Sequence, residues 1–206
     1  MQPETQRSAQ ALAARVASLA KHVRAYESES LQAEARQLIP WEAVETYAAE
    51  EDAGLGKSPG EYTGRAALAK GLMRWFKKDF FKWTNKPSCP NPNCGRGGPF
   101  QEPIGMLAPS SEEREQGWAS VVEGYQCKEC STVHRFPRYN NPAVLLHTRK
   151  GRCGEWANCF TLICRAAGFE ARHVTDWTDH VWTEVILPRR ERDKRQPEGW
   201  KEGVHH

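Results

Sequence analysis

Long apolar runs are missing from this 206-residue sequence. No window approaches the run of about 20 apolar residues that a membrane-spanning helix needs. The residues that follow Met1 also lack the basic segment and the apolar segment of a secretory signal peptide. We therefore expect a soluble protein without a membrane partner, located in the cytoplasm, with the nucleus as a second candidate compartment.

A large excess of charge of one sign is missing as well. The chain has 29 Lys and Arg against 26 Asp and Glu, which leaves a formal net charge of +3. So small an excess does not indicate a nucleic-acid partner, because such partners are read from clustered charge. The 39% of hydrophobic residues are enough for a core, which excludes a wholly disordered protein.

Cysteine, by contrast, is well represented, with seven residues. In a reducing intracellular compartment, close cysteine pairs more often bind metal or take part in chemistry than form structural disulfides. The positions of the cysteines are therefore the main functional signal in this sequence.

Apolar residues recur every three or four positions through much of the first 80 residues, as they do in amphipathic helices. Pro40 separates two of these segments. Residues 52–60 hold three glycines and a proline, which is typical of a loop. The predicted helices cover residues 8–27, residues 31–38, a segment that opens at Trp41, and residues 63–80.

The last of these helices has a basic face outside its apolar stripe. We interpret this face as solvated rather than as a nucleic-acid patch. A zinc-ribbon nucleic-acid binder that used residues 70–82 is an alternative that rests on basic charge alone. The basic residues are Lys70, Arg74, Lys77 and Lys78.

The second half of the chain changes character twice. Residues 86–130 contain prolines, glycines and four cysteines without a sustained period, so we expect a small module organised by something other than an apolar core. Residues 152–168 have the period of a helix, and two strands are predicted at about 170–177 and 180–187. The highly charged residues 189–201 predict no regular element.

Two pairs of cysteines have the spacing of metal-binding knuckles. Cys89 and Cys94 form the first pair, Cys127 and Cys130 form the second, and 32 residues lie between the pairs. Two disulfides or four free thiols are the alternatives, and the intracellular setting favours a metal over both. Tetrahedral zinc needs four ligands, so we predict a structural Zn²⁺ site without an open coordination position.

Cys153 differs from the other cysteines because it lies at the start of the predicted helix 152–168. Unpaired backbone N–H groups and the positive end of the helix dipole favour a thiolate at such a position. Cys159 and Cys164 lie deeper in the same helix and are expected to be buried structural thiols. Cys153 is therefore the candidate nucleophile.

A thiolate catalyst needs an imidazole, and His180 supplies one at the start of the second predicted strand. The alternation of a strand places His180, Trp182 and Glu184 on one face, and the apolar residues of the strand on the other. We therefore expect His180 to point away from the core of the sheet, toward the end of the helix. Three other histidines compete without comparable context: His134, His147 and His173.

Several of these segments resemble the cytosolic peptide:N-glycanases, which are members of the transglutaminase-like superfamily. The resemblance is carried by RFPRYNNP at residues 135–142, GRCGEWANCFTLICRA at 151–166, DHVWTEV at 179–185, and FKWTN at 81–85. It spans about residues 75–187, and the placement of a four-cysteine insertion before the helix with Cys153 is similar as well.

The resemblance implies an amidase that cleaves the bond between an asparagine side chain and the innermost N-acetylglucosamine of N-glycans. Cys153 would be the nucleophile, and His180 the general base and then acid. Trp83 would line the cleft and help to stabilise the oxyanion, and Glu184 and Trp156 would be pocket residues. The implied substrates are unfolded glycoproteins exported from the endoplasmic reticulum. Proteasome-associated ubiquitin-receptor shuttle proteins are the implied partners of the N-terminal region.

The resemblance also implies an α+β fold of the transglutaminase-like, papain-like type, in which the catalytic helix packs on an antiparallel sheet. We expect a helical N-terminal region at residues 1–60 and a catalytic core at residues 61–206. The zinc-binding insertion would occupy about residues 86–131 of that core.

Two departures from the family stand out. The family carries an aspartate on the strand after the histidine strand, and that motif is not present here. Four residues separate Cys89 from Cys94, where the family usually has two. We therefore expect a chain that is C-terminally truncated relative to its family and has impaired activity. The alternative is a catalytically inactive glycoprotein- or partner-binding module of the same fold.

Overall fold

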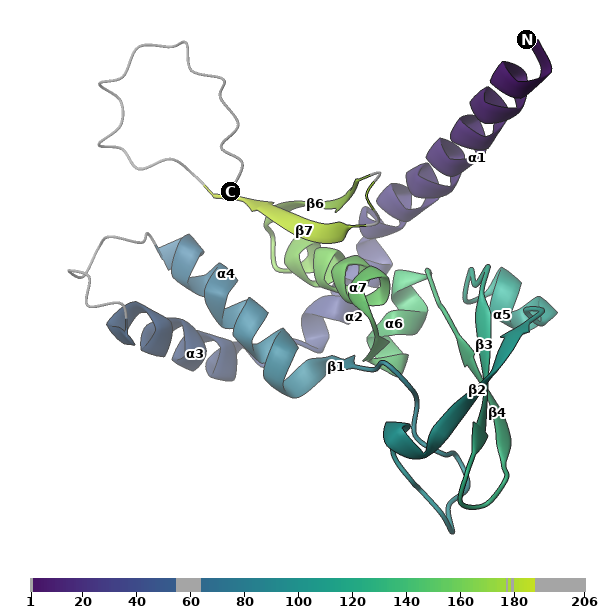
Figure 1. The fold of residues 1–206 in the computed structure, drawn as a ribbon. Coiled ribbons are helices and arrows are strands. Elements are labelled where there is room, and N and C mark those ends of the chain that lie inside the picture. The colour runs from purple at the N-terminus through teal and green to yellow at the C-terminus, as the bar shows by residue number, and fades with distance from the viewer. Residues whose placement is uncertain (1, 55–63, 177, 179, 188–206) are drawn as a thin grey trace.

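The computed structural model describes residues 2–54, 64–176, 178 and 180–187 (Figure 1). The helices are α1 (Gln2–Tyr26), α2 (Glu29–Gln37), α3 (Trp41–Gly54), α4 (Gly64–Trp75), α5 (Ser111–Glu115), α6 (Pro142–Thr148) and α7 (Cys153–Ala166). The strands are β1 (Lys82–Trp83), β2 (Gln101–Leu107), β3 (Val122–Cys127), β4 (Val133–Pro137), β5 (Lys150–Gly151), β6 (Glu170–Thr175) and β7 (Val181–Ile186). Among these helices none has the length and apolarity to cross a membrane.

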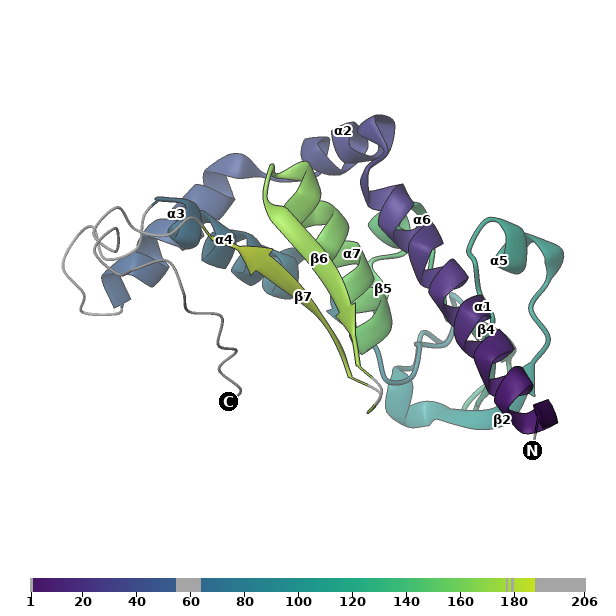
Figure 2. The same ribbon diagram turned by 90° about the horizontal axis from the view of Figure 1, so that it is seen from above.

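The fold is a mixed α+β arrangement with antiparallel sheets. Strands β2, β3 and β4 form one three-stranded antiparallel sheet, and β6 and β7 form an antiparallel hairpin. The short strands β1 and β5 pair in parallel. Helix α7 packs on the β6–β7 hairpin, and the sheet of β2–β4 stands to one side of them (Figures 1 and 2).

The helices predicted from the apolar period are confirmed, and their bounds differ by a few residues. The expected helix 63–80 is α4 followed by a π-helical turn at Phe76–Phe80. The two predicted strands correspond to β6 and β7. Two predicted features lie largely or wholly outside the described residues: the loop at 52–60, apart from its first residues in α3, and the charged segment 189–201.

One hydrophobic core joins the N-terminal helices to α4 and α7. The buried stripe of α7, which includes Leu162 and Ile163, packs against α2 and α4, and buried residues of α3 belong to the same core. Polar contacts support the same packing, because the Tyr26 hydroxyl donates to Asn158 Oδ1 at 2.6 Å and Arg36 Nε donates to the carbonyl of Ala166 at 2.8 Å. The N-terminal helices thus hold the outer side of the helix that begins at Cys153.

Helix α1 is amphipathic, but most of its apolar stripe is exposed. Leu12, Val16 and Val23 are 47%, 56% and 56% exposed, whereas Tyr26 at the end of the helix is buried. The first part of α1 extends away from the rest of the molecule (Figures 1 and 2). Among the side chains of α1 that the structure describes, the buried core includes Tyr26 in its last turn.

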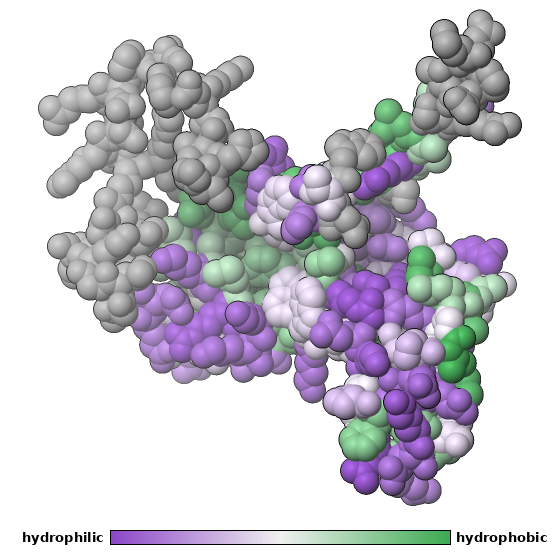
Figure 3. Space-filling view, in the orientation of Figure 1, coloured by the Kyte–Doolittle hydropathy of each residue, from purple (hydrophilic) through white to green (hydrophobic). Residues whose placement is uncertain are grey.

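The basic face of α4 is solvated and partly neutralised. Arg74 forms ion pairs with Glu50 at 2.7 Å and Glu51 at 3.2 Å, and its guanidinium lies over the ring of Tyr47. Lys77 and Lys78 are exposed, and the surface over α3 and α4 is mainly hydrophilic (Figure 3). The acidic residues of α3 reduce the local excess of positive charge, which agrees with a solvated face.

Gly71 allows α3 and α4 to pack closely, which gives a test of this contact. A Cβ at Gly71 would lie 2.3 Å from the carbonyl oxygen of Val44 and 3.0 Å from the Cβ of Ala48, so the helices would have to separate. We expect Gly71→Ala to lower the free energy of unfolding by about 1–3 kcal/mol, measured by urea unfolding. Gly64→Ala is the matched control, because a Cβ there meets nothing within 4 Å. Equal stability of the two variants would contradict this packing.

Candidate active site and metal centre

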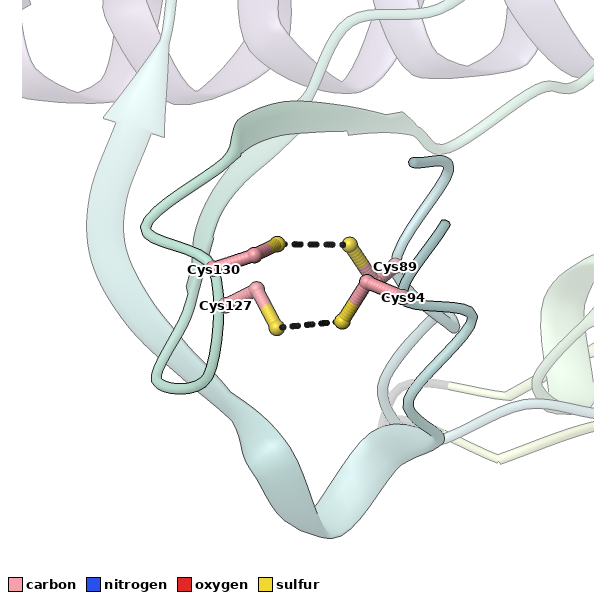
Figure 4. A group of neighbouring side chains, drawn as sticks. All are labelled: Cys89, Cys94, Cys127 and Cys130. Atoms are coloured by element: carbon pink, nitrogen blue, oxygen red, sulfur yellow. Dashed lines mark hydrogen bonds between the residues drawn. The ribbon is translucent and has the colours of Figure 1, made fainter. Parts of the chain in front are cut away.

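The four cysteines of the two predicted knuckles meet in one cluster. Their sulfur atoms all lie within 4.8 Å of one another. Cys89 Sγ lies 3.5 Å from Cys130 Sγ, and Cys94 Sγ lies 3.7 Å from Cys127 Sγ, with the two pairs pointing toward each other from separate loops (Figure 4). Tetrahedral coordination with bonds of about 2.3 Å places sulfurs about 3.8 Å apart, so the cluster is compatible with a structural metal.

The longer first knuckle still closes on the cluster because Asn91 organises it. The carbonyl of Asn91 accepts hydrogen bonds from the N–H groups of Cys94 and Gly95, and its side chain accepts one from the N–H of Asn93. Gly95 adopts a φ of 58°, a left-handed conformation that glycine tolerates well. The extra residues of this knuckle therefore form a compact turn that keeps Cys94 at the cluster.

The second knuckle favours ionised sulfur. Hydrogen bonds from Thr132 lower the pKa of Cys130 to about 6, and a hydrogen bond from the backbone of Cys130 lowers the pKa of Cys127. Metal ions bind thiolates rather than thiols, so these hydrogen bonds prepare the knuckle for a cation.

In the first knuckle, burial raises the pKa of Cys89. Despite a backbone hydrogen bond from Arg96, burial and the neighbouring thiols raise the pKa of Cys94 to about 12. The fit to a metal ion therefore rests on the four sulfurs and their spacing.

Cys153 is the first residue of α7 and is exposed. The segment before it is fixed by the β1–β5 ladder, in which the N–H of Lys82 donates to Arg149 and the N–H of Thr84 donates to Gly151, both at 2.8 Å. In the described part of the chain Cys153 is the only exposed cysteine. The thiol of Cys153 is therefore accessible at a helix N-terminus, as predicted.

The two other cysteines of α7 are buried, also as predicted. Cys159 is 0% exposed and Cys164 is 1% exposed. Burial raises the pKa of both thiols, to about 12 for Cys164. A buried thiol with a raised pKa is a poor nucleophile, so these residues serve the packing of α7.

His180 lies at the same end of α7 as Cys153. Thr183 of β7 sets this register, because its hydroxyl donates to the carbonyl of Ala157 at 3.0 Å and lies 2.9 Å from Thr161 Oγ1. Because β6 begins just after the C-terminal end of α7 and Thr183 of β7 contacts Ala157, the hairpin runs back toward the N-terminal end of α7 (Figure 2). Both side chains are exposed, and no direct hydrogen bond joins them among the described residues.

Asp176 holds the backbone of the turn that carries His180. Its carboxylate accepts hydrogen bonds from the N–H of His180 at 3.1 Å and from the N–H and hydroxyl of Thr178. The hydrogen bond from Thr178 is the main cause of a lowered pKa of Asp176, and the N–H of His180 adds to it. Asp176 is therefore ionised at neutral pH, and its acceptor role is one that the sequence did not predict.

The two faces of β7 differ as the predicted alternation requires. Thr183 and Val185 face α7 and the core, whereas Trp182 is exposed. Glu184 accepts hydrogen bonds from Arg172, which lower its pKa, and from the indole N–H of Trp182 at 3.1 Å. Glu184 is thus held as a carboxylate on the face of the hairpin away from α7.

Trp83 and Trp156 lie near each other but in different surroundings. Trp83 is 55% exposed and lines an open cavity of about 640 Å³ together with Lys82, Lys86 and Lys150. Its indole N–H donates to Asn85 Oδ1 at 2.9 Å. The ring of Trp156 lies 6.1 Å from that of Trp83, and it packs edge-on against Phe76 and Phe81 of the core.

A cluster of two arginines and two glutamates joins the sheet of β2–β4 to the first turn of α7. Arg138 binds the carboxylates of both Glu155 and Glu123, and Arg152 binds Glu123 through two nitrogens at 2.7 and 2.9 Å. These contacts were not predicted from the sequence. The presence of Glu155 two residues after Cys153 was the one local signal, because a carboxylate in the first turn caps a helix.

The charge of Glu123 gives the fold a predictable dependence on pH. Burial alone would raise the pKa of Glu123, but hydrogen bonds from Arg152 and Tyr125 outweigh burial and hold it at about 2, below the ordinary value of 4.5. This carboxylate therefore stabilises the fold above pH 4.5, and its contribution is lost as the pH falls toward 2. We expect the difference in unfolding free energy between the unmodified chain and Glu123→Gln to shrink over that range, measured by urea unfolding. A difference independent of pH would contradict the assignment.

A family model and several individual proteins match this chain. The sequence model of the transglutaminase-like superfamily matches residues 107–202. Relatives named peptide-N(4)-(N-acetyl-beta-glucosaminyl)asparagine amidase include one from Gallus gallus, 46% identical over 170 residues, which are 82% of this chain and 25% of that protein. The Homo sapiens relative is 45% identical over 179 residues, 84% of this chain and 26% of that protein. The Saccharomyces cerevisiae relative is 46% identical over 132 residues, 64% of this chain and 36% of that protein.

This chain spans about a quarter of the length of the chicken and human relatives. The matches nevertheless cover most of this chain at an identity that indicates common descent. Residues 107–202 of the chain therefore match the transglutaminase-like superfamily, and most of the chain is similar to proteins named peptide-N(4)-(N-acetyl-beta-glucosaminyl)asparagine amidase.

Proposed function

We propose that this chain is the catalytic core of a deglycosylating amidase, a hydrolase that cleaves the bond between asparagine and N-acetylglucosamine in N-glycans. The observation that carries the proposal is the accessible thiol of Cys153 at the N-terminus of α7, beside the turn of His180. The names of relatives that are 44–46% identical support the substrate class.

In the proposed reaction, the thiolate of Cys153 attacks the side-chain carbonyl carbon of the glycosylated asparagine. The tetrahedral intermediate collapses to a thioester, and the glycosylamine leaves with a proton from His180. Water, deprotonated by His180, then hydrolyses the thioester. The products are an aspartate in the peptide, a free glycosylamine and the regenerated thiol.

The oxyanion of this reaction needs hydrogen-bond donors in place before the attack. The backbone N–H of Cys153 is one proposed donor, since the first N–H groups of a helix have no partner within the helix. The indole N–H of Trp83 donates to Asn85, so it would have to leave that partner to serve as a second donor. We therefore assign Trp83 to the wall of the cleft, with Trp156 behind it.

Glu184 has a proposed role in binding the sugar. Its carboxylate is ionised and lies on β7, four residues beyond His180. A carboxylate accepts hydrogen bonds from sugar hydroxyls, and Arg172 and Trp182 fix its orientation. The proposed core is papain-like, with the nucleophile on a helix and the imidazole beside a neighbouring strand.

We propose Zn²⁺ as the metal of the four-cysteine cluster. Four thiolates at tetrahedral spacing are the ligand set that suits structural zinc, and Cys89, Cys94, Cys127 and Cys130 would supply it. With four protein ligands the ion has no free position for substrate. Zinc would hold the two loops of the module together, and the residues around Cys153 would carry out the reaction.

Unfolded N-glycoproteins are the proposed substrates, in the cytoplasm and in the degradation of proteins exported from the endoplasmic reticulum. Proteasome-associated ubiquitin-receptor shuttle proteins are proposed partners of the N-terminal helices. The exposed apolar side chains Leu12, Val16 and Val23 of α1 support a protein contact there.

The test is hydrolysis of a heat-denatured N-glycoprotein by the chain in water enriched in ¹⁸O. The proposal predicts release of intact glycan and conversion of the linked asparagine to an aspartate that carries ¹⁸O, as read by peptide mass spectrometry. A cooperatively folded, metal-loaded chain that yields no aspartate would overturn the proposal. Release of the glycan without conversion of asparagine would assign the chain to glycosidic rather than amide chemistry.

A further inference from the structure

The residue before the candidate nucleophile is held by side chains of the metal module. Arg152 precedes Cys153, and its guanidinium binds the carboxylate of Glu123 at 2.7 and 2.9 Å. The same guanidinium donates to the carbonyl of Asn85 at 2.5 Å, and the backbone N–H of Arg152 donates to Glu155 at 3.0 Å. The position of Cys153 is thus fixed through its neighbour by three separate segments.

The carboxylate of Glu155 is the most buried charge of this cluster. Its side chain is 5% exposed, and Arg138 binds both of its oxygens, at 2.8 Å for Oε2. Gly151 leaves the space that this carboxylate fills, because a Cβ there would lie 2.4 Å from the Cβ of Glu155. A buried carboxylate without its arginine is strongly unfavourable, so Arg138 and Glu155 must be placed together.

Two members of the cluster lie on or directly after the β3–β4 pair of strands, which carries Cys127 and Cys130. Glu123 is on β3, the strand that ends at Cys127. Arg138 directly follows β4, which pairs with β3 so that Glu123 lies opposite Phe136. Cys127 ends β3 and Cys130 lies in the turn between β3 and β4, so the same pair of strands carries two cysteines of the four-cysteine cluster at one end and Glu123 at the other, with Arg138 directly after β4.

We propose that Glu123 and Arg138 are positioning residues, through which the metal module sets the first turn of α7 and the reactivity of Cys153. The inference deepens the proposed function, since it takes Cys153 as the nucleophile of the amidase. The physical coupling itself can be measured on the thiol alone. A chain without amidase activity can therefore be distinguished from a chain in which the metal module does not affect Cys153.

The sign of the effect separates positioning from simple electrostatics. Removal of the negative charge of Glu123 would by itself favour a thiolate nearby and speed its alkylation. Loss of the clamp would instead loosen the first turn of α7, whose N–H groups and dipole favour the thiolate, and slow its alkylation. If Glu123 acts by positioning, alkylation of Cys153 should therefore be slower in Glu123→Gln. If only its charge mattered, alkylation should be faster.

The experiment measures the rate of alkylation of Cys153 by iodoacetamide at pH 7, in the metal-loaded chain, by peptide mass spectrometry. We expect Glu123→Gln to slow alkylation about 5-fold, within the range that residues of a coupling network produce. Glu113→Gln is the matched control, because Glu113 forms a similar pair with Arg135, at 2.7 and 2.9 Å, within the module and away from α7. The control is expected to react at the unmodified rate.

Arg138→Lys tests the clamp from its other side. Lysine keeps the charge but not the two-pronged geometry, so we expect slower alkylation and faster hydrogen–deuterium exchange in residues 151–156. Removal of the metal by a chelator should accelerate exchange in the same residues, in addition to residues 86–131. In the active amidase, both Glu123→Gln and Arg138→Lys should lower kcat more than they change KM.

Two results would overturn the proposal. One is alkylation in Glu123→Gln at the unmodified rate or faster, with unchanged exchange in residues 151–156. The other is an equal loss of reactivity in Glu113→Gln, which would indicate general loosening of the module. Neither result depends on whether the chain hydrolyses glycoproteins, so the coupling is tested even if the proposed amidase activity is absent.

Discussion

Replacement of Cys153 by alanine is expected to abolish conversion of glycosylated asparagine to aspartate. The loss should be at least about 10⁴-fold in kcat, because removal of a nucleophile leaves no alternative path through a thioester. Rates of glycan release from a denatured glycoprotein, measured by mass spectrometry, give the comparison. Since Cys153 is exposed, the variant should keep its metal and its melting temperature.

Cys164→Ala is the matched control for the loss of a thiol from the same helix. Cys164 is buried, so this variant should be less stable yet retain turnover in its folded fraction. An active Cys153→Ala variant would remove Cys153 from the reaction and with it the central role of the α7 N-terminus. Equal losses in both variants would point to packing of α7 rather than to chemistry.

Replacement of Cys127 by serine is expected to release the metal and unfold the module. Structural zinc sites contribute binding free energies of about 10–16 kcal/mol, and the module has few other means of holding its two loops together. Metal content by mass spectrometry should fall below one ion per chain. Hydrogen–deuterium exchange should rise across residues 86–131, while the core around Leu162 keeps its protection.

Cys153→Ala serves as the control in this experiment, because it removes a cysteine that does not belong to the cluster. It should retain one metal ion per chain. A Cys127→Ser variant with full metal content and unchanged exchange would contradict the assignment of the four cysteines. Full metal content in which the ion is not zinc would change the proposed metal and leave the site in place.

The position of Cys153 could be predicted from the sequence because the signals are local. The apolar period of α7 places its start within a residue, and only Cys153 among the three cysteines of the helix lies at that start. The four cysteines of the metal cluster could be predicted for a similar reason, since short spacing within each pair defines a knuckle. Both predictions use residues that are close in the sequence and do not depend on contacts between distant segments.

The charge cluster at α7 could not be predicted in this way. Glu123 and Arg152 are separated by 29 positions in the sequence, and Arg138 and Glu155 by 17. Each of these residues, taken alone, is a charged residue of the kind usually found on a solvated surface. Only the docking of the sheet of β2–β4 against the first turn of α7 brings their side chains together.

The sheet of β2–β4 was missed for a different physical reason. Strand β2 is at the edge of its sheet, and nearly all of its residues are exposed, so it lacks the alternation that marks a half-buried strand. Helix α1 shows the opposite case, because its period is clear but Leu12, Val16 and Val23 are exposed. Periodicity thus predicted the helix but not what covers its apolar side.

Identification of the covalent intermediate would show whether Cys153 is the nucleophile. The chain would be mixed with a denatured glycopeptide, quenched rapidly with acid and mapped by peptide mass spectrometry. We expect a thioester between the aspartyl peptide and Cys153, formed with the loss of the glycosylamine and absent in Cys153→Ala. Turnover with the peptide attached to another residue, or to none while Cys153→Ala remains active, would contradict this expectation.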